Sequence, residues 1–192
     1  MPPQSFYVRP LAPRHRHCIA LDVSRFSALD VAGQAHVRTE LFAITEGVAA
    51  DLQVNCRPGV HSDRGDGLML VTDCGIEVLV TDFPRRLGDA VRRYNEDASP
   101  DVRVQLRQAL DAGYVHQDDR GYAGVPLNRA ARLLDAPEFK AKMMEHGAEF
   151  AVIISTELYE EIQEYHLLDE RKLEKVQVDV KETHTMARMW IP

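Results

Sequence analysis

Apolar residues recur along this chain in two different rhythms. Over 34–52 they return every three or four residues, which predicts a helix with one buried face. Over 101–110 apolar and polar residues alternate, which predicts a strand. Three short apolar runs, each bounded by turn residues or polar residues, predict buried strands at 17–23, 68–71 and 151–154. The chain therefore mixes helices with strands.

The remaining pattern completes an alternating order of elements. Further helices are predicted at 83–95, 125–134, 138–144 and 157–165, and a closing hairpin at 176–180 with 186–190. The run 76–80 fits either a strand or the start of a helix. Hairpins interrupt the alternation of strands and helices, which favours an α+β fold with a mixed sheet over a doubly wound parallel sheet.

Two carboxylates stand at the ends of predicted strands. Asp22 follows an apolar run, and Asp66 lies between two glycines just before the next one. Glycines let the backbone turn sharply, so this turn would present Asp66 at the mouth of a strand. Two converging carboxylates suit hard divalent cations such as Mg²⁺ or Mn²⁺. Either acid alone is equally compatible with an ordinary turn or capping role.

A polar pair marks the helix predicted at 125–134. Asn128 and Arg132 are four residues apart and so share a face of that helix. Such a pair could orient a ribose and neutralise a phosphate during its transfer. Taken alone, the pair also fits a solvated polar stripe.

Four segments in order resemble the catalytic domain of class III nucleotidyl cyclases, the adenylyl and guanylyl cyclase superfamily. They are 20–27 and 64–71, similar to its two metal motifs, 102–113, similar to the following strand and glycine, and 122–133, similar to its Asn…Arg helix. The resemblance covers about 17–190. It implies a ferredoxin-like βαββαβ-type cyclase homology domain with a mixed sheet flanked by helices. We accordingly expect one catalytic domain at 17–192, preceded by an irregular arm at 1–16.

The resemblance also implies roles for individual residues. Asp22 and Asp66, together with Val23, would hold two Mg²⁺ or Mn²⁺ ions, while Asn128 would position the ribose and Arg132 would stabilise charge on the α-phosphate. The ribose 3′-hydroxyl would attack the α-phosphate and expel pyrophosphate. Because this family builds its site between two catalytic domains, a chain of this kind is expected to act as a homodimer.

Phosphate contacts are expected from two places. The loop that leaves the first strand would offer backbone amides, as such loops often do; its residues are Ser24, Arg25 and Phe26. Lys181 falls near the position of the family's triphosphate-binding lysine, although the neighbouring glycines of that motif are missing.

The residues that read a purine base in this family are absent. Their positions carry Ser62 and Gly121, so other groups such as Arg64 or Tyr122 would have to hold the base. Mismatched hydrogen-bonding groups discriminate strongly between bases. Stand-alone bacterial cyclases that make cyclic UMP or cyclic CMP in anti-phage signalling are similar in size and also lack this code, so we favour a pyrimidine cyclase with a cyclic-nucleotide-sensing effector downstream. A purine cyclase with unusual base contacts and a cyclase-like module without turnover remain the alternatives.

Composition limits the partners and the compartment. The net charge of −7 argues against a protein held on nucleic-acid phosphates. No apolar run approaches the roughly 20 residues that span a bilayer, so no membrane partner is expected. The three cysteines form no C-x-x-C motif and are interpreted as reduced thiols, and no secretory signal is recognisable at the N-terminus. We therefore expect a cytoplasmic protein.

Overall fold

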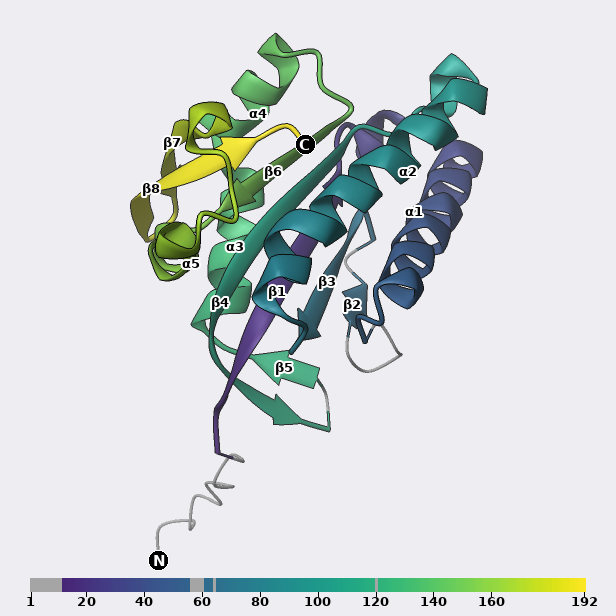
Figure 1. Cartoon of the computed structure of the whole chain (residues 1–192). Coiled ribbons are helices and arrows are strands. Elements are labelled where there is room, and N and C mark those ends of the chain that lie inside the picture. The colour runs from purple at the N-terminus through teal and green to yellow at the C-terminus, as the bar shows by residue number, and fades with distance from the viewer. Residues whose placement is uncertain (1–11, 56–60, 64, 120) are drawn as a thin grey trace, which may run out of the picture.

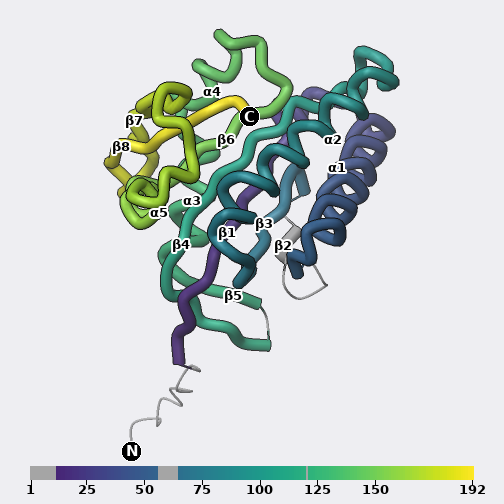
Figure 2. The backbone as a smooth tube through the Cα atoms, in the orientation of Figure 1, coloured from purple at the N-terminus to yellow at the C-terminus, as the bar shows by residue number. Residues whose placement is uncertain are grey.

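The computed structural model describes residues 12–55, 61–63, 65–119 and 121–192, with the side chains of 61–63 left out. Figures 1 and 2 show the path of the chain. Its main elements are β1 (Arg14–Val23), α1 (Val31–Asp51), β2 (His61–Asp63), β3 (Gly67–Thr72), α2 (Phe83–Asp97), β4 (Leu106–Asp118), β5 (Gly121–Ala123), α3 (Val125–Asp135), α4 (Pro137–Glu145), β6 (Phe150–Ile154), α5 (Thr156–Ile162), β7 (Glu174–Val180) and β8 (Thr183–Trp190).

The strands of the described chain form one mixed sheet in the order β2-β3-β1-β4-β6-β8-β7, with β5 paired to β4. Strand β1 lies at the centre of the first half, antiparallel to both β3 and β4. The chain order β1-α1-β2-β3-α2-β4 with the sheet order β2-β3-β1-β4 is the ferredoxin-like βαββαβ arrangement. Strand β6 joins β4 in parallel and carries the β7–β8 hairpin. The expected α+β fold is therefore confirmed.

Helices cover both faces of this sheet. Along β1 the side chains of Ile19 and Leu21 enter a core that includes α1 and α2, whereas Cys18 and Ala20 enter a second core that includes α3 and α4. Successive residues of a strand point to opposite faces, so one strand supplies both cores. Each large aliphatic side chain buried in this way contributes about 1.5–3 kcal/mol. The helices α1 and α2 lie together on one face in Figure 1.

The sheet differs from the predicted pattern at two strands. Strand β1 begins at Arg14, so residues 14–16 belong to the sheet and not to the irregular arm. The strand predicted from 101 begins only at Leu106, because Pro100–Val102 form a 3-10 turn and Val104 pairs with a side chain. The Asn95 amide accepts from the Val104 N–H and donates to its carbonyl oxygen, both at 2.8 Å, and so takes the place of a strand neighbour.

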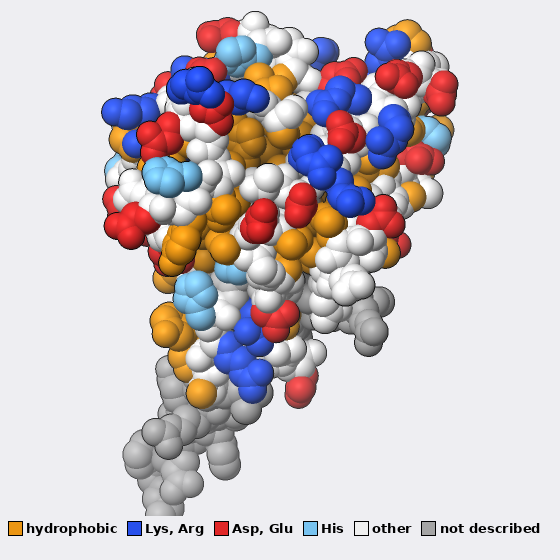
Figure 3. Space-filling model, in the orientation of Figure 1, with side chains coloured by type: hydrophobic (Ala, Val, Ile, Leu, Met, Phe, Trp, Pro, Cys, Tyr) orange, Lys and Arg blue, Asp and Glu red, His pale blue; other side chains and the backbone are white. Residues whose placement is uncertain are grey.

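The open choice at 76–80 resolves as helix, since Val78–Asp82 form a short π-helical segment that runs into α2. Among the described residues, no helix combines the length and the apolarity needed to cross a bilayer. Over α1 and α2, basic and acidic side chains are interspersed on the surface in Figure 3.

Candidate active site

Asp22 and Asp66 are brought together by the pairing of β1 with β3. Asp22 lies opposite Gly67 in the register, and the Val23 N–H donates to the Asp66 carbonyl oxygen at 3.0 Å. A Cβ atom at Gly67 would lie 2.0 Å from the Leu21 carbonyl oxygen, far inside contact distance. Gly67 is therefore required for the close approach of the two backbones, which places both acids where β1 ends and β3 begins.

A cavity of about 60 Å³ lies between these strand ends and helix α3. Its walls are Leu21, Asp22, Asp66, Ala131, Leu134 and Asp135. The cavity has the size and the oxygen donors for small hard cations, which prefer carboxylate and carbonyl ligands. Within the described residues, no three His, Cys, Asp or Glu side chains are arranged to hold one ion together. A metal would therefore depend on the two strand-end acids, main-chain oxygens and substrate phosphates.

Asp22 already has a cationic partner in the same chain. The Arg107 Nη2 atom donates to Asp22 Oδ2 at 2.7 Å, and the two side chains are only 9% and 16% exposed. The residues face each other because they are register partners of β1 and β4. Burial raises the pKa of the Asp22 carboxyl, and neighbouring Asp66 adds to this, while Arg107 opposes it. Arg107 thus partly neutralises Asp22, whose side chain also belongs to the wall of the cavity.

Asn128 and Arg132 lie on α3, but their side chains are not in the wall of this cavity. Asn128 is exposed to solvent. Arg132 donates to Thr183 Oγ1 at 2.9 Å and pairs with Glu182, both in the region of the β7–β8 hairpin. Lys181 is in the turn of the same hairpin with a positive φ of 52°. The Arg132 side chain therefore contacts the hairpin that carries Lys181. The two acids instead lie beside Ala131, Leu134 and Asp135, on another side of α3.

A buried ion pair fixes α3 against the sheet. Asp111 of β4 is fully buried and accepts from Arg129 Nε at 2.6 Å and from Arg129 Nη2 at 2.9 Å. Ser155 Oγ and the Ala112 N–H also donate to it, at 2.6 and 2.8 Å. Burial raises the pKa of the Asp111 carboxyl, although these donors oppose the rise. Because Arg129 directly follows Asn128, the pair sets the rotation of the helix that carries the catalytic candidates.

In the expected phosphate loop at 24–26, one backbone amide already has a hydrogen-bond partner. The Ser24 N–H donates to the Gln105 carbonyl oxygen at 2.8 Å. Arg25 has a left-handed backbone with φ 60°, and Phe26 begins a 3-10 turn. A non-glycine residue held at positive φ is a strained conformation that is enriched at ligand-binding sites. The amides of Arg25 and Phe26 are therefore the stronger phosphate candidates in this loop.

Of the base candidates, Gly121 and Tyr122 are described in full. Both belong to β5, where Tyr122 faces Gln117 across the hairpin and Gly121 has a φ of 124°. Ser62 lies in β2 opposite Met69, but its side chain is outside the described residues, as is Arg64. The base assignment remains a prediction.

The sequence analysis did not identify three charged residues at or beside this site: Arg107, Asp111 and Asp135. In the predicted strand at 101–110, Arg107 is one of several polar residues that alternate with apolar ones. Its contact with Asp22 depends on strand register, which a single sequence does not give. Asp111 comes one residue after that strand, and its full burial, which is rare for an aspartate, is visible only in the structure.

Comparison with solved structures identifies the fold. An adenylate/guanylate cyclase/hydrolase from Silicibacter pomeroyi is 17% identical with a TM-score of 0.64, over 94% of this chain and 99% of that one. The chain has the fold of a cyclase catalytic domain. The adenylyl cyclase CyaB from P. aeruginosa matches at 13% identity and a TM-score of 0.58, over 94% and 95% of the two chains.

A third match is the guanylate cyclase domain of RhGC from Catenaria anguillulae in complex with GTP, at 16% identity and a TM-score of 0.56 over 93% and 96% of the two chains. No protein-family model and no curated protein sequence matches this chain. At these identities the likeness is one of fold, so activity has to be argued from the site.

Proposed function

We propose that the protein is a nucleotide cyclase, which converts a nucleoside triphosphate into a 3′,5′-cyclic nucleotide and pyrophosphate. The observation that supports this most strongly is the convergence of Asp22 and Asp66 at one cavity, in a fold shared with cyclase catalytic domains. The ribose 3′-oxygen forms a bond to the α-phosphorus, and the bond from that phosphorus to the bridging oxygen breaks. Pyrophosphate leaves, and the hydroxyl proton is released.

The residues divide this work between them. Asp22, Asp66 and the main chain of Val23 would hold two Mg²⁺ or Mn²⁺ ions, which when bound stabilise charge on the attacking and leaving oxygens. Asn128 orients the ribose, and Arg132 neutralises the α-phosphate. Lys181 and the loop at Arg25 bind the rest of the triphosphate.

The separation of the acids from Arg132 supports a homodimer as the active form. In one chain the acids line a cavity beside Ala131 and Asp135, and Arg132 is directed to the β7–β8 hairpin. A second chain with two-fold symmetry would supply Asn128 and Arg132 to the acids of the first. Each dimer then has two equivalent sites.

For the base we propose a pyrimidine, UTP or CTP. The purine-reading side chains of the resembling family are replaced by Ser62 and by Gly121, which offers no side chain to a base. The product would serve as an anti-phage messenger for a cyclic-nucleotide-sensing effector. The solved structures named above are adenylate and guanylate cyclases, and this favours a purine substrate as the second candidate.

A module without turnover is the third candidate. It is favoured by one observation, since Asp22 and Arg132 are each held in an ion pair within the single chain. The four residues of the proposed chemistry are nevertheless all present, which a domain without turnover does not need.

Mass spectrometry of products separates these candidates. The purified protein is incubated with equimolar ATP, GTP, CTP and UTP plus Mn²⁺, and cyclic UMP or cyclic CMP is expected. Cyclic AMP or cyclic GMP would identify a purine cyclase. The absence of any cyclic product, also with phage-derived activators, would overturn the proposed activity and leave the module without turnover.

A further inference from the structure

A second cavity lies at the opposite end of β1 from Asp22. Its volume is about 260 Å³, and its walls are Ala12, Arg14, Arg16, Val115, Gln117 and Tyr122. Arg14 and Asp22 are eight residues apart on one strand, which corresponds to about 27 Å at 3.4 Å per residue. This cavity is therefore separate from the acids of the same chain.

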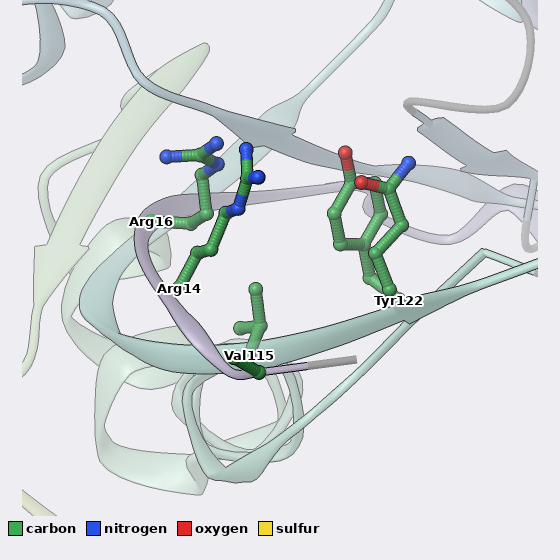
Figure 4. A pocket seen from close by; sticks show the side chains of 6 residues that line it. Arg14, Arg16, Val115 and Tyr122 are labelled. Atoms are coloured by element: carbon green, nitrogen blue, oxygen red, sulfur yellow. The ribbon is translucent and has the colours of Figure 1, made fainter. Parts of the chain in front are cut away.

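Strand register directs both arginines to one place. Arg14 and Arg16 are two residues apart, so they share a face of β1, and Arg14 lies opposite Val115 of β4. Arg16 lies opposite Gly113, which has no side chain; a Cβ atom there would come within 2.8 Å of the Pro126 ring. Figure 4 shows the two guanidinium groups side by side, with Tyr122 facing them and Val115 between.

The charges of this cavity are poorly balanced. Among the described residues, the six that line this cavity include no carboxylate. The only ion pair described for either arginine joins Arg16 to Asp73 at 3.8 Å, and the Asp73 side chain is 71% exposed. An exposed pair at this distance contributes little. Two neighbouring guanidinium groups of the same sign repel each other, and a bound anion would remove that repulsion.

We propose that this cavity binds the phosphate groups of a small ligand, with a diphosphate as the best fit. Planar guanidinium groups bind phosphate oxygens in pairs, and the Tyr122 hydroxyl and the Gln117 amide add neutral donors on the far wall. The volume is just below the roughly 300–1,000 Å³ of drug-sized sites, which suits a diphosphate more than a whole nucleotide. The diphosphate is either free pyrophosphate or the tail of a nucleotide whose base stays outside.

A ligand here would also connect β1 to the segment that leads into α3. Gln117 and Tyr122 form a cross-strand pair of the β4–β5 hairpin, and Gly124 follows directly before α3. An anion held between the arginines and this hairpin would fix the approach to Asn128. The binding itself does not depend on the proposed cyclase activity.

Titration calorimetry of pyrophosphate into the intact chain, without divalent metal and at physiological ionic strength, tests the proposal. We expect saturable binding that persists in the double variant Asp22→Asn/Asp66→Asn and weakens at least about tenfold in Arg14→Gln/Arg16→Gln. The matched control Arg85→Gln/Arg93→Gln makes the same charge change on α2 and should bind as the unmodified chain does. Circular dichroism of each variant checks that the fold is retained.

A parallel titration with a nucleoside triphosphate distinguishes the two sources. Tighter binding of the nucleotide than of pyrophosphate identifies a nucleotide tail, and the reverse identifies free pyrophosphate. Absence of binding to the unmodified chain, or equal binding by the Arg14→Gln/Arg16→Gln variant, overturns the proposal. Pyrophosphate binding in a protein that makes no cyclic nucleotide would overturn the cyclase proposal alone.

Discussion

At the scale of single residues, two glycines decide where Asp66 lies. Gly65 has a φ of 86°, which other residues rarely adopt, and Gly67 has no room for a Cβ beside Leu21. The first glycine turns the chain, and the second allows β3 to approach β1. The carboxylate between them is thereby held next to Asp22, which is the arrangement that a metal site needs.

Substitution of either acid should lower activity without unfolding the protein. Asp22→Asn or Asp66→Asn removes a negative charge from the proposed metal site, so Mn²⁺-dependent turnover should fall at least about a hundredfold. Asp89→Asn, which changes the charge equally on α2, should retain turnover. Initial rates of cyclic nucleotide formation measure the effect, with thermal unfolding as the check on folding. Near-normal turnover in Asp66→Asn would show that this acid holds no metal.

At the scale of elements, the sequence predicted the helices and central strands well but not their contacts. Helix α3 was expected at 125–134 and spans Val125–Asp135, because its period is strong and Pro126 suits a first turn. The strand predicted at 101–110 is confirmed from Leu106 onward. Its first residues are not strand, because the Asn95 side chain binds the backbone of Val104, a contact between segments that periodicity does not encode.

In the candidate site, too, single residues could be predicted from the sequence but their contacts could not. Asp22 and Asp66 were recognisable because local features, a strand end and a glycine turn, mark them. Arg107 and Asp111 were not, because their roles arise from strand register and from packing against α3. A short segment of sequence can reveal a strand-end acid or a glycine turn, whereas the partner of a buried charge lies far away in the sequence.

The anchoring of α3 by a buried ion pair has a measurable consequence. Arg129→Gln removes the main partner of fully buried Asp111, and breaking a buried pair typically costs about 3–5 kcal/mol. We expect the free energy of unfolding in urea to fall by about 3 kcal/mol. Arg171→Gln, which breaks an exposed pair with Asp169, should leave it nearly unchanged. Equal stabilities of the two variants would show that the Asp111 pair does not anchor the helix.

At the scale of the whole molecule, the question is whether one chain contains a complete site. The acids and Arg132 are on different sides of α3, and both Asp22 and Arg132 have partners inside the chain. In a two-fold dimer each site would take its acids from one chain and Asn128 with Arg132 from the other. The division of the site between chains then explains why the two acids and Arg132 do not meet in the single chain.

Mixing of inactive variants tests this division. Asp66→Ala and Arg132→Ala chains should each be inactive, but their hybrid dimer has one intact site. Random exchange makes half of the dimers hybrid, so the mixture should recover about a quarter of the unmodified activity. A mixture of Asp22→Ala with Asp66→Ala should recover none, because every site then lacks one acid. If exchange is confirmed by mass spectrometry and the first mixture stays as inactive as the second, the site is not shared between chains.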